Sequence, residues 1–143
     1  MPDILHRVGI AAPLDKVFTT LTTLDGNRGW WDSNATGDAK EGGELTFFRH
    51  VFKVIEALPN ETVKWKCVRG SPEWLNTTVE FRLVYKDNQT FVMFTHADWK
   101  KSVEFMHHCS TKWATVLIGL RSGLEGGAFA AFPDDTKISG SWR

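Results

Sequence analysis

Residues 102–126 read SVEFMHHCSTKWATVLIGLRSGLEG, and this stretch decides the fold. Its apolar side chains recur at steps of three and four residues, which places them on one face of an α-helix. The members of this apolar stripe are Met106, Cys109, Trp113, Val116, Leu117, Leu120 and Leu124. No proline interrupts the run, and Gly126-Gly127 is expected to end it because glycine readily adopts the left-handed conformation of a helix end. A helix of about 25 residues spans roughly 37 Å, so it needs an equally long apolar surface to lie on.

Alternating apolar and polar residues upstream of this helix predict strands that supply such a surface. The expected strands are residues 3–11, 44–50, 51–58, 63–67, 77–85 and 90–98. Because short turns join most of them, neighbouring strands are expected to run antiparallel. Residues 51–58 carry apolar side chains on both faces, which leaves their inward face unassigned. Residues 33–43 are small, polar and charged, which indicates a loop or a weak edge strand.

Two short helices are expected after the first strand. Pro13 is well placed to open an amphipathic helix over residues 14–21, and a second helical turn is expected over residues 24–30. Residues 128–143 show little periodicity. The order of elements predicts one α+β domain over residues 1–143, in which a curved antiparallel sheet of about six strands wraps around the long C-terminal helix.

The charge balance limits the classes of partner. The chain has 17 Lys and Arg residues and 17 Asp and Glu residues, which argues against a nucleic acid held by bulk electrostatics and against an anionic membrane surface. No apolar run approaches the ~18 residues needed to span a bilayer, and the first residues lack an export signal. Cys67 and Cys109 are too few for a disulfide scaffold, and both fall at apolar positions. A cytoplasmic protein is the simplest expectation.

Several motifs resemble those of one family. Ile10-Ala11-Ala12-Pro13 with Val17-Phe18 resembles the opening of the SRPBCC (START/Bet v-like) helix-grip superfamily, and Trp30-Trp31 resembles a tryptophan pair of its branch named activator of heat-shock-protein-90 ATPase homologue. Further matches to that branch are Gly42-Gly43, Val54-x-Glu56, Pro59, Val63-x-Trp65, Thr90 to His96, Trp113, Leu117, Leu120 and Glu125. The resemblance runs from about Leu5 to Gly126 and implies a helix-grip fold. Members bind lipids or other apolar small molecules, catalyse cyclisation or hydrolysis, or assist a chaperone, so the fold does not select a function.

The chain is rich in aromatic residues, with seven Trp and ten Phe. A well-filled core would explain them, but the resemblance favours an aromatic-lined cavity between the C-terminal helix and the sheet. The candidate cavity residues are Trp30, Trp31, Phe47, Trp65, Phe81, Phe94, His96, Met106, Cys109, Trp113 and Leu117. Two adjacent tryptophans in a loop do not easily both face inward, so one of Trp30 and Trp31 is expected at the rim, exposed to a ligand or partner.

The polar candidates are mainly histidines. His96 shares a strand face with Val92 and Phe94, and a pocket imidazole there could orient a ligand or move a proton. A core histidine satisfied by a backbone group is the simpler interpretation. His107 and His108 point about 100° apart on a helix, so they predict no metal site, and no catalytic residue or cofactor is expected.

Three functions remain open from the sequence. We favour a soluble binding domain without enzymatic activity, whose partner is a small hydrophobic or amphipathic molecule. The first alternative is an enzyme of the same fold, of hydrolase or cyclase type, that uses a pocket histidine. The second is a co-chaperone-like contact domain with an exposed apolar patch around Trp30-Trp31. A homodimer is compatible with each of them.

Overall fold

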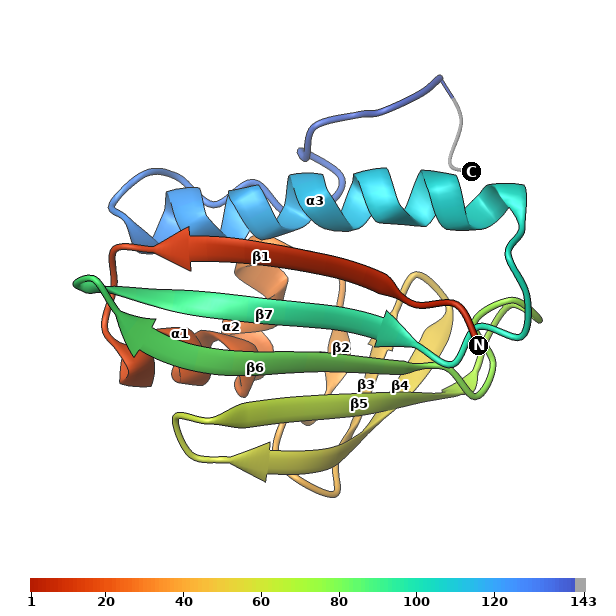
Figure 1. Cartoon of the computed structure of the whole chain (residues 1–143), viewed down its shortest axis with the longest axis horizontal. Coiled ribbons are helices and arrows are strands. Elements are labelled where there is room, and N and C mark those ends of the chain that lie inside the picture. Colours follow the sequence, from red (N-terminus) through yellow and green to blue (C-terminus); the bar gives the residue numbers. More distant parts are fainter. Residues whose placement is uncertain (141–143) are drawn as a thin grey trace.

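Seven antiparallel strands form one curved sheet that holds a long C-terminal helix (Figure 1). This computed structural model describes residues 1–140. The elements are β1 (Ile4–Ile10), α1 (Leu14–Leu21), α2 (Leu24–Trp30), β2 (Thr36–Gly37), β3 (Glu44–Phe47), β4 (His50–Leu58), β5 (Thr62–Arg69), β6 (Thr78–Lys86), β7 (Gln89–Ala97) and α3 (Glu104–Leu124). The strand order across the sheet is β1-β7-β6-β5-β4-β3-β2, and each neighbouring pair is antiparallel. The helix-grip fold predicted from the sequence is therefore confirmed.

Helix α3 runs alongside β1 and turns its apolar stripe toward the sheet (Figure 1). Its buried residues are Phe105, Cys109, Trp113, Val116, Leu117 and Leu120. The predicted stripe included Met106, but the buried residue one turn before Cys109 is Phe105. Met106 is only half-buried. The helix ends at Leu124, and Gly126 follows with a φ of +95°, as the glycine pair predicted. Among residues 1–140, no helix combines the length and the apolar character that crossing a membrane requires.

The concave face of the sheet is apolar because inward-facing residues recur at every second position. In β5, Val63, Trp65 and Cys67 have no exposed surface. Phe81 and Phe94 lie opposite each other on β6 and β7, with ring centroids 5.4 Å apart. Fully burying one such large apolar side chain contributes roughly 1.5–3 kcal/mol, so this face is the main source of stability in the sheet.

A tight hairpin joins β3 to β4, where the sequence predicted one strand continuing to residue 50. Phe48 and Arg49 have φ values of +50° and +70°, so the strand ends at Phe47 and His50 pairs with it. Two-residue hairpin turns need left-handed backbone, which Asn or Gly usually supplies. This turn has neither residue, so the sequence carries no signal for it.

The inward face of β4, which the sequence left unassigned, is set by Phe52 and Val54, both fully buried. Register shifts follow Val51 and Val54, and Ile55 turns outward with 42% of its surface exposed. These irregularities explain why apolar residues occupy both faces of the strand. The seventh strand, β2, is only two residues long and pairs with β3, within the segment predicted as a loop or a weak edge strand.

Trp30 and Trp31 are both buried, with 1% and 3% of their surfaces exposed. This corrects the prediction that one of the pair is exposed in an apolar patch. The end of α2 lies over the concave sheet, which offers both rings a partner. Trp30 meets Phe81 edge-on with centroids 6.0 Å apart, and Trp31 stacks on Trp65 at 5.8 Å with an interplanar angle of 7°.

Candidate functional site

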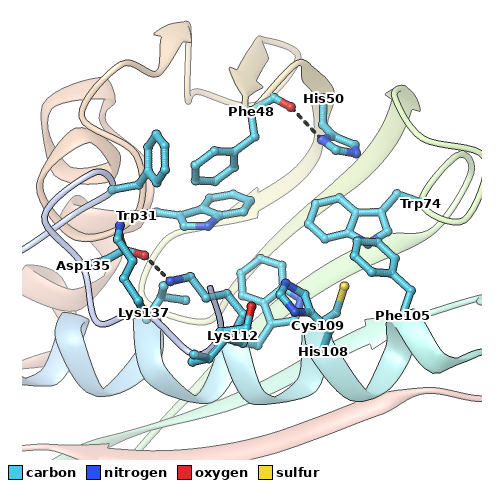
Figure 2. Close-up of a pocket in the computed structure, with 15 residues that line it drawn as sticks. Trp31, Phe48, His50, Trp74, Phe105, His108, Cys109, Lys112, Asp135 and Lys137 are labelled. Atoms are coloured by element: carbon cyan, nitrogen blue, oxygen red, sulfur yellow. Dashed lines mark hydrogen bonds and ion pairs between the residues drawn. The ribbon is translucent and has the colours of Figure 1, made fainter. Parts of the chain in front are cut away.

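A cavity of about 130 Å³ lies between α3, the β3–β4 turn and the C-terminal segment, and Figure 2 shows the side chains around it. Its aromatic wall consists of Trp31, Phe48, Trp74, Phe105, Trp113 and Phe132. Its polar side chains are His50, His108, Lys112, Asp135, Lys137 and Ser139, and Cys109, Val116 and Ile138 complete the lining. A concave, mostly apolar space with a few convergent polar groups is the usual form of a small-molecule site.

The tryptophans of the wall support one another. Trp31 lies 4.8 Å from Trp113 between ring centroids, and Trp74 lies nearly parallel to Trp113 at 6.2 Å with an interplanar angle of 14°. Both separations fall in the range in which aromatic pairs attract. Trp74 is also a buried indole whose Nε1 makes no hydrogen bond with any residue in the described part of the chain. The wall therefore combines flat apolar surfaces with one N–H donor, Trp74 Nε1, that has no acceptor in the described part of the chain.

His96 lies behind this wall and is fully buried. Trp113 Nε1 donates to His96 Nδ1 at 3.0 Å, which leaves Nε2 to donate to Thr77 Oγ1 at 2.8 Å, and Thr77 Oγ1 donates to the Trp74 carbonyl at 2.6 Å. Burial, with a smaller effect from His50, lowers the pKa of His96 to about 3. The imidazole is therefore neutral near neutral pH, and its hydrogen bonds go to side chains rather than to the backbone group that was expected.

His50 presents a second neutral imidazole, this one at the cavity wall. Its Nδ1 lies 3.1 Å from the Phe48 carbonyl oxygen and its Nε2 lies 3.1 Å from Ser71 Oγ. The carbonyl can only accept, so Nδ1 donates and Nε2 accepts from the hydroxyl. Burial lowers the pKa of His50 below its ordinary value, which keeps the ring uncharged near neutral pH.

Residues 128–140, which we name the C-terminal strap, close one side of the cavity. The Phe132 N–H donates to the Trp31 carbonyl at 2.9 Å, and the Ser33 N–H donates to the Phe132 carbonyl at 3.0 Å. The Phe129 ring lies against Gly123, where a Cβ atom would come within 2.1 Å of it. The strap is thus attached to the loop after α2 and to the end of α3.

Three charged side chains meet where the strap passes the cavity (Figure 2). Asp135 forms ion pairs with Lys112 of α3 and with Lys137 of the strap. Lys112 also donates to the Thr136 carbonyl at 2.9 Å, and Lys137 donates to the Pro133 carbonyl at 2.7 Å. Burial by itself raises the pKa of the Asp135 carboxyl, but the hydrogen bonds from both lysines outweigh it and hold the pKa below its usual value.

The structure brings only part of the predicted cavity set to the cavity. Trp31, Cys109 and Trp113 line it. Trp30, Phe47, Trp65, Phe81, Phe94, His96 and Leu117 are buried in the core behind it. Met106 is half-buried on α3 and does not line it. The sequence pattern identifies which residues face inward, but the cavity forms only at one end of the inward surface.

Several lining residues were missed from the sequence. Phe48 sits in the hairpin turn that carried no signal, and Trp74 lies in the loop between β5 and β6 that was not assigned to any face. Lys112 lies outside the apolar stripe that the sequence defines on α3, and the strap had no periodicity to interpret. An aromatic residue in an irregular segment, such as Phe132, is the one signal that could have pointed to the strap.

The histidine pair His107-His108 does not form part of a metal cluster. His107 is exposed on α3, whereas His108 lines the cavity and stacks against Phe105 with ring centroids 5.6 Å apart. Within residues 1–140, no group of three or more His, Cys, Asp or Glu side chains has an arrangement that could hold a metal ion.

With this geometry established, the chain can be compared with known proteins. The family model described as Activator of Hsp90 ATPase homolog 1-like protein matches residues 11–125. The chain belongs to this family. The solution structure of the Aha1 dimer from Colwellia psychrerythraea is 41% identical in sequence, with a TM-score of 0.81, and the match covers 89% of this chain and 98% of that one. The family predicted from the sequence motifs is confirmed.

More distantly similar structures share the fold. Protein SSP2350 from Staphylococcus saprophyticus is 18% identical with a TM-score of 0.74, over 91% of this chain and 97% of that one. CalU16 from Micromonospora echinospora is 23% identical with a TM-score of 0.73, over 87% of this chain and 74% of that one. At these identities the likeness shows the fold alone. No curated protein matches the chain significantly.

Proposed function

We propose that this domain binds a small hydrophobic or amphipathic molecule in the cavity beside α3. The observation that carries the proposal is the aromatic-walled cavity of about 130 Å³ that lies at the edge of the core, between α3, the β3–β4 turn and the strap. An apolar cavity of about 150 Å³ holds a benzene molecule, so this space is large enough for a ring-sized ligand. Membership of a helix-grip family supports the same proposal, because the cavity lies between the long helix and the sheet end.

The contacts of His96 favour binding over catalysis. The ring is fully buried, its two nitrogens are both hydrogen-bonded, and it does not line the cavity. A general base must come within about 3 Å of the atom whose proton it removes, and His96 lies behind Trp113, whose indole N–H already occupies its Nδ1. The enzymatic alternative therefore cannot use His96, and the histidines that line the cavity are His50 and His108.

The binding proposal is tested by filling the cavity. Cys109→Phe places a ring in the cavity from its buried position on α3, and Thr111→Phe adds the same ring at an exposed position two residues away. We expect native mass spectrometry or a thermal-shift screen of small aromatic and aliphatic molecules to find a ligand for the wild-type chain. Binding should be lost in Cys109→Phe and kept in Thr111→Phe, with circular dichroism confirming that both fold. Equal binding by both variants would contradict the proposal.

We also propose that the chain forms a homodimer, on the basis of the Colwellia psychrerythraea relative. That protein is described as a dimer, and the match covers 98% of its chain at 41% identity. Sedimentation velocity of the full chain at micromolar concentration tests this directly, and a single monomeric species would contradict it. A chaperone contact remains a hypothesis from the family description, and the burial of Trp30 and Trp31 removes the surface that it was expected to use.

A further inference from the structure

We propose that the ligand is a single-ring aromatic monoanion, such as an aromatic carboxylate, whose ring lies against the tryptophans and whose anionic group is held by Lys112 and Lys137. This inference rests on the proposed binding function and adds the chemical class of the ligand. It depends on the size of the cavity, on the charges beside it and on the hydrogen-bond donors that those charges leave free.

The volume of the cavity matches a ligand of about one ring. Its volume of about 130 Å³ is slightly below that of the cavity of about 150 Å³ that holds benzene. Six aromatic side chains surround this space, and the rings of Trp74 and Trp113 are close to parallel. Flat rings packed edge-to-face or offset gain attraction beyond the area they bury. A long acyl chain or a fused polycyclic molecule exceeds this volume, so part of it would extend beyond the aromatic wall.

The charged groups of the lining favour a negative ligand. Lys112, Lys137 and Asp135 are the Lys, Arg, Asp and Glu side chains that line the cavity within the described residues. They sum to one positive charge, and burial keeps the neighbouring His50 neutral. Lys112 is the more shielded lysine, with 26% of its side chain exposed against 55% for Lys137. A charge shielded from water attracts an opposite charge more strongly than an exposed one does.

Each lysine retains a donor for the anion. An ammonium group has three N–H donors. In the described structure Lys112 uses two of them, on Asp135 and on the Thr136 carbonyl, and Lys137 uses two, on Asp135 and on the Pro133 carbonyl. A carboxylate could therefore accept one charge-assisted hydrogen bond from each lysine without displacing Asp135.

Asp135 also orders the two lysines before any ligand arrives. Long side chains lose conformational entropy when a ligand immobilises them, and prior ordering reduces that loss. Only 6% of the Asp135 side chain is exposed, and its carboxylate contacts both ammonium groups. Asp135 thus acts as a positioning residue for a pair of cations, and the strap that carries it helps to form the anion site.

The test compares four ligands of known charge and shape on the full chain. Benzoate is the proposed class, benzyl alcohol is its neutral counterpart, benzylamine is its cationic counterpart and decanoate is a long-chain anion. Titration followed by calorimetry and by tryptophan fluorescence measures each affinity, since Trp31, Trp74 and Trp113 line the cavity. We expect benzoate to bind about a hundredfold more tightly than benzyl alcohol, about tenfold for each of the two charge-assisted hydrogen bonds from the lysines. Benzylamine and decanoate should bind more weakly than either.

Lysine variants assign the effect to the site. Lys112→Met and Lys137→Met should each weaken benzoate by about tenfold and leave benzyl alcohol unchanged. Lys66→Met removes an exposed lysine of β5 away from the cavity and should leave both ligands unchanged. If one lysine variant disturbed the structure of the strap, it would weaken both benzoate and benzyl alcohol. The second lysine variant then still tests the effect of charge on benzoate alone. Asp135→Asn keeps both lysines but removes the carboxylate that orders them, so benzoate should bind it more weakly than it binds the wild type. An unchanged benzoate affinity in this variant would overturn the positioning role of Asp135.

The outcomes separate the two proposals. If benzyl alcohol binds as tightly as benzoate, or decanoate binds more tightly, the cavity binds small molecules but the anionic single-ring inference is wrong. If benzylamine binds most tightly, Asp135 rather than the lysines selects the ligand. If none of the four binds or shifts the melting temperature, the inference is wrong, and the screen described for the proposed function decides whether the cavity binds anything.

Discussion

The aromatic cluster of this domain has a filled end and a hollow end, and the two are built from different kinds of segment. At the filled end, Trp65 and Phe81 come from paired strands, whose register fixes the positions of both side chains. At the hollow end, Phe48 comes from a turn, Trp74 from a loop and Phe132 from the strap. Regular pairing brings complementary side chains together, whereas loops set their own distances, and here they leave a space.

Trp31 lies at the boundary between these two regions. It stacks on Trp65 in the filled region, which we call the core, and it also lines the cavity. A rigid core behind one wall makes that wall a fixed surface for a ligand. The opposite wall depends on strap contacts, which are fewer and closer to solvent. The comparison predicts large effects for changes in the core and smaller, local effects for changes at the cavity.

The largest effect is expected for Trp65→Ala. Its ring has no exposed surface and touches Trp31, Phe47 and Phe81. Removing a buried ring of this size costs about 3–5 kcal/mol of unfolding free energy, which urea denaturation would measure. Tyr85→Ala is the matched control, because 51% of that side chain is exposed. A loss for Trp65→Ala as small as that for Tyr85→Ala would contradict the description of the core.

The two cysteines provide a direct comparison of the regions. Cys67 lies in β5 of the core, and burial raises the pKa of its thiol to about 11, while Cys109 lines the cavity. Local opening requires less free energy than global unfolding, so iodoacetamide should modify Cys109 at least about tenfold faster than Cys67 in the native protein. Peptide mass spectrometry over time separates the two rates. Equal rates would mean that the strap opens only when the whole domain unfolds.

The buried His96 should make stability depend on pH. Its pKa is about 3 in the folded chain and 6.5 in the unfolded reference, so the unfolded chain takes up the proton first as the pH falls. Stability is therefore fully present above about pH 6.5 and falls toward pH 3 by up to about 1.4 kcal/mol per pH unit. Urea melts at several pH values should show a smaller slope in His96→Gln, while His107→Gln, at an exposed position, should keep the wild-type slope.

The smallest effect is expected for Phe132→Ala in the strap. Its half-buried ring meets Phe48 edge-on with centroids 5.1 Å apart. Losing one aromatic pair at a partly exposed site costs about 1 kcal/mol. Hydrogen exchange should show the change at the Ser33 amide, which donates to the Phe132 carbonyl, while the amide of Val63 in the core stays protected. An equal change at both amides would mean that strap and core open together.

The sequence was a good guide to the core and a poor one to the cavity. Strict alternation in Val63, Trp65 and Cys67 predicts their inward face, and the structure buries all three completely. The apolar stripe of α3 was found for the same reason, because its period is a property of the helix. Pro13 and the apolar pattern after it placed the short helices correctly. Motifs such as Trp30-Trp31 identified the family, although both tryptophans proved to be buried.

The cavity could not be derived in the same way because its position depends on distances between irregular segments. The Phe48-Arg49 turn has left-handed backbone without Asn or Gly, so the register at that end was not readable. Lys112 lies outside the apolar stripe of its helix, and at the cavity it contacts Asp135 and the Thr136 carbonyl of the strap. Local patterns cannot show such a pairing between residues 23 positions apart.

The strap has one more consequence, for how ligand preference could diverge among relatives. The family model ends at residue 125, and the strap begins at residue 128. The inherited fold supplies the tryptophan walls and Lys112, whereas Phe132, Asp135 and Lys137 come from outside the matched region. A dozen residues that stabilise little of the core can therefore be replaced at low cost to folding. Related chains could keep the aromatic wall of the cavity and change which ligand it selects by exchanging only the C-terminal strap.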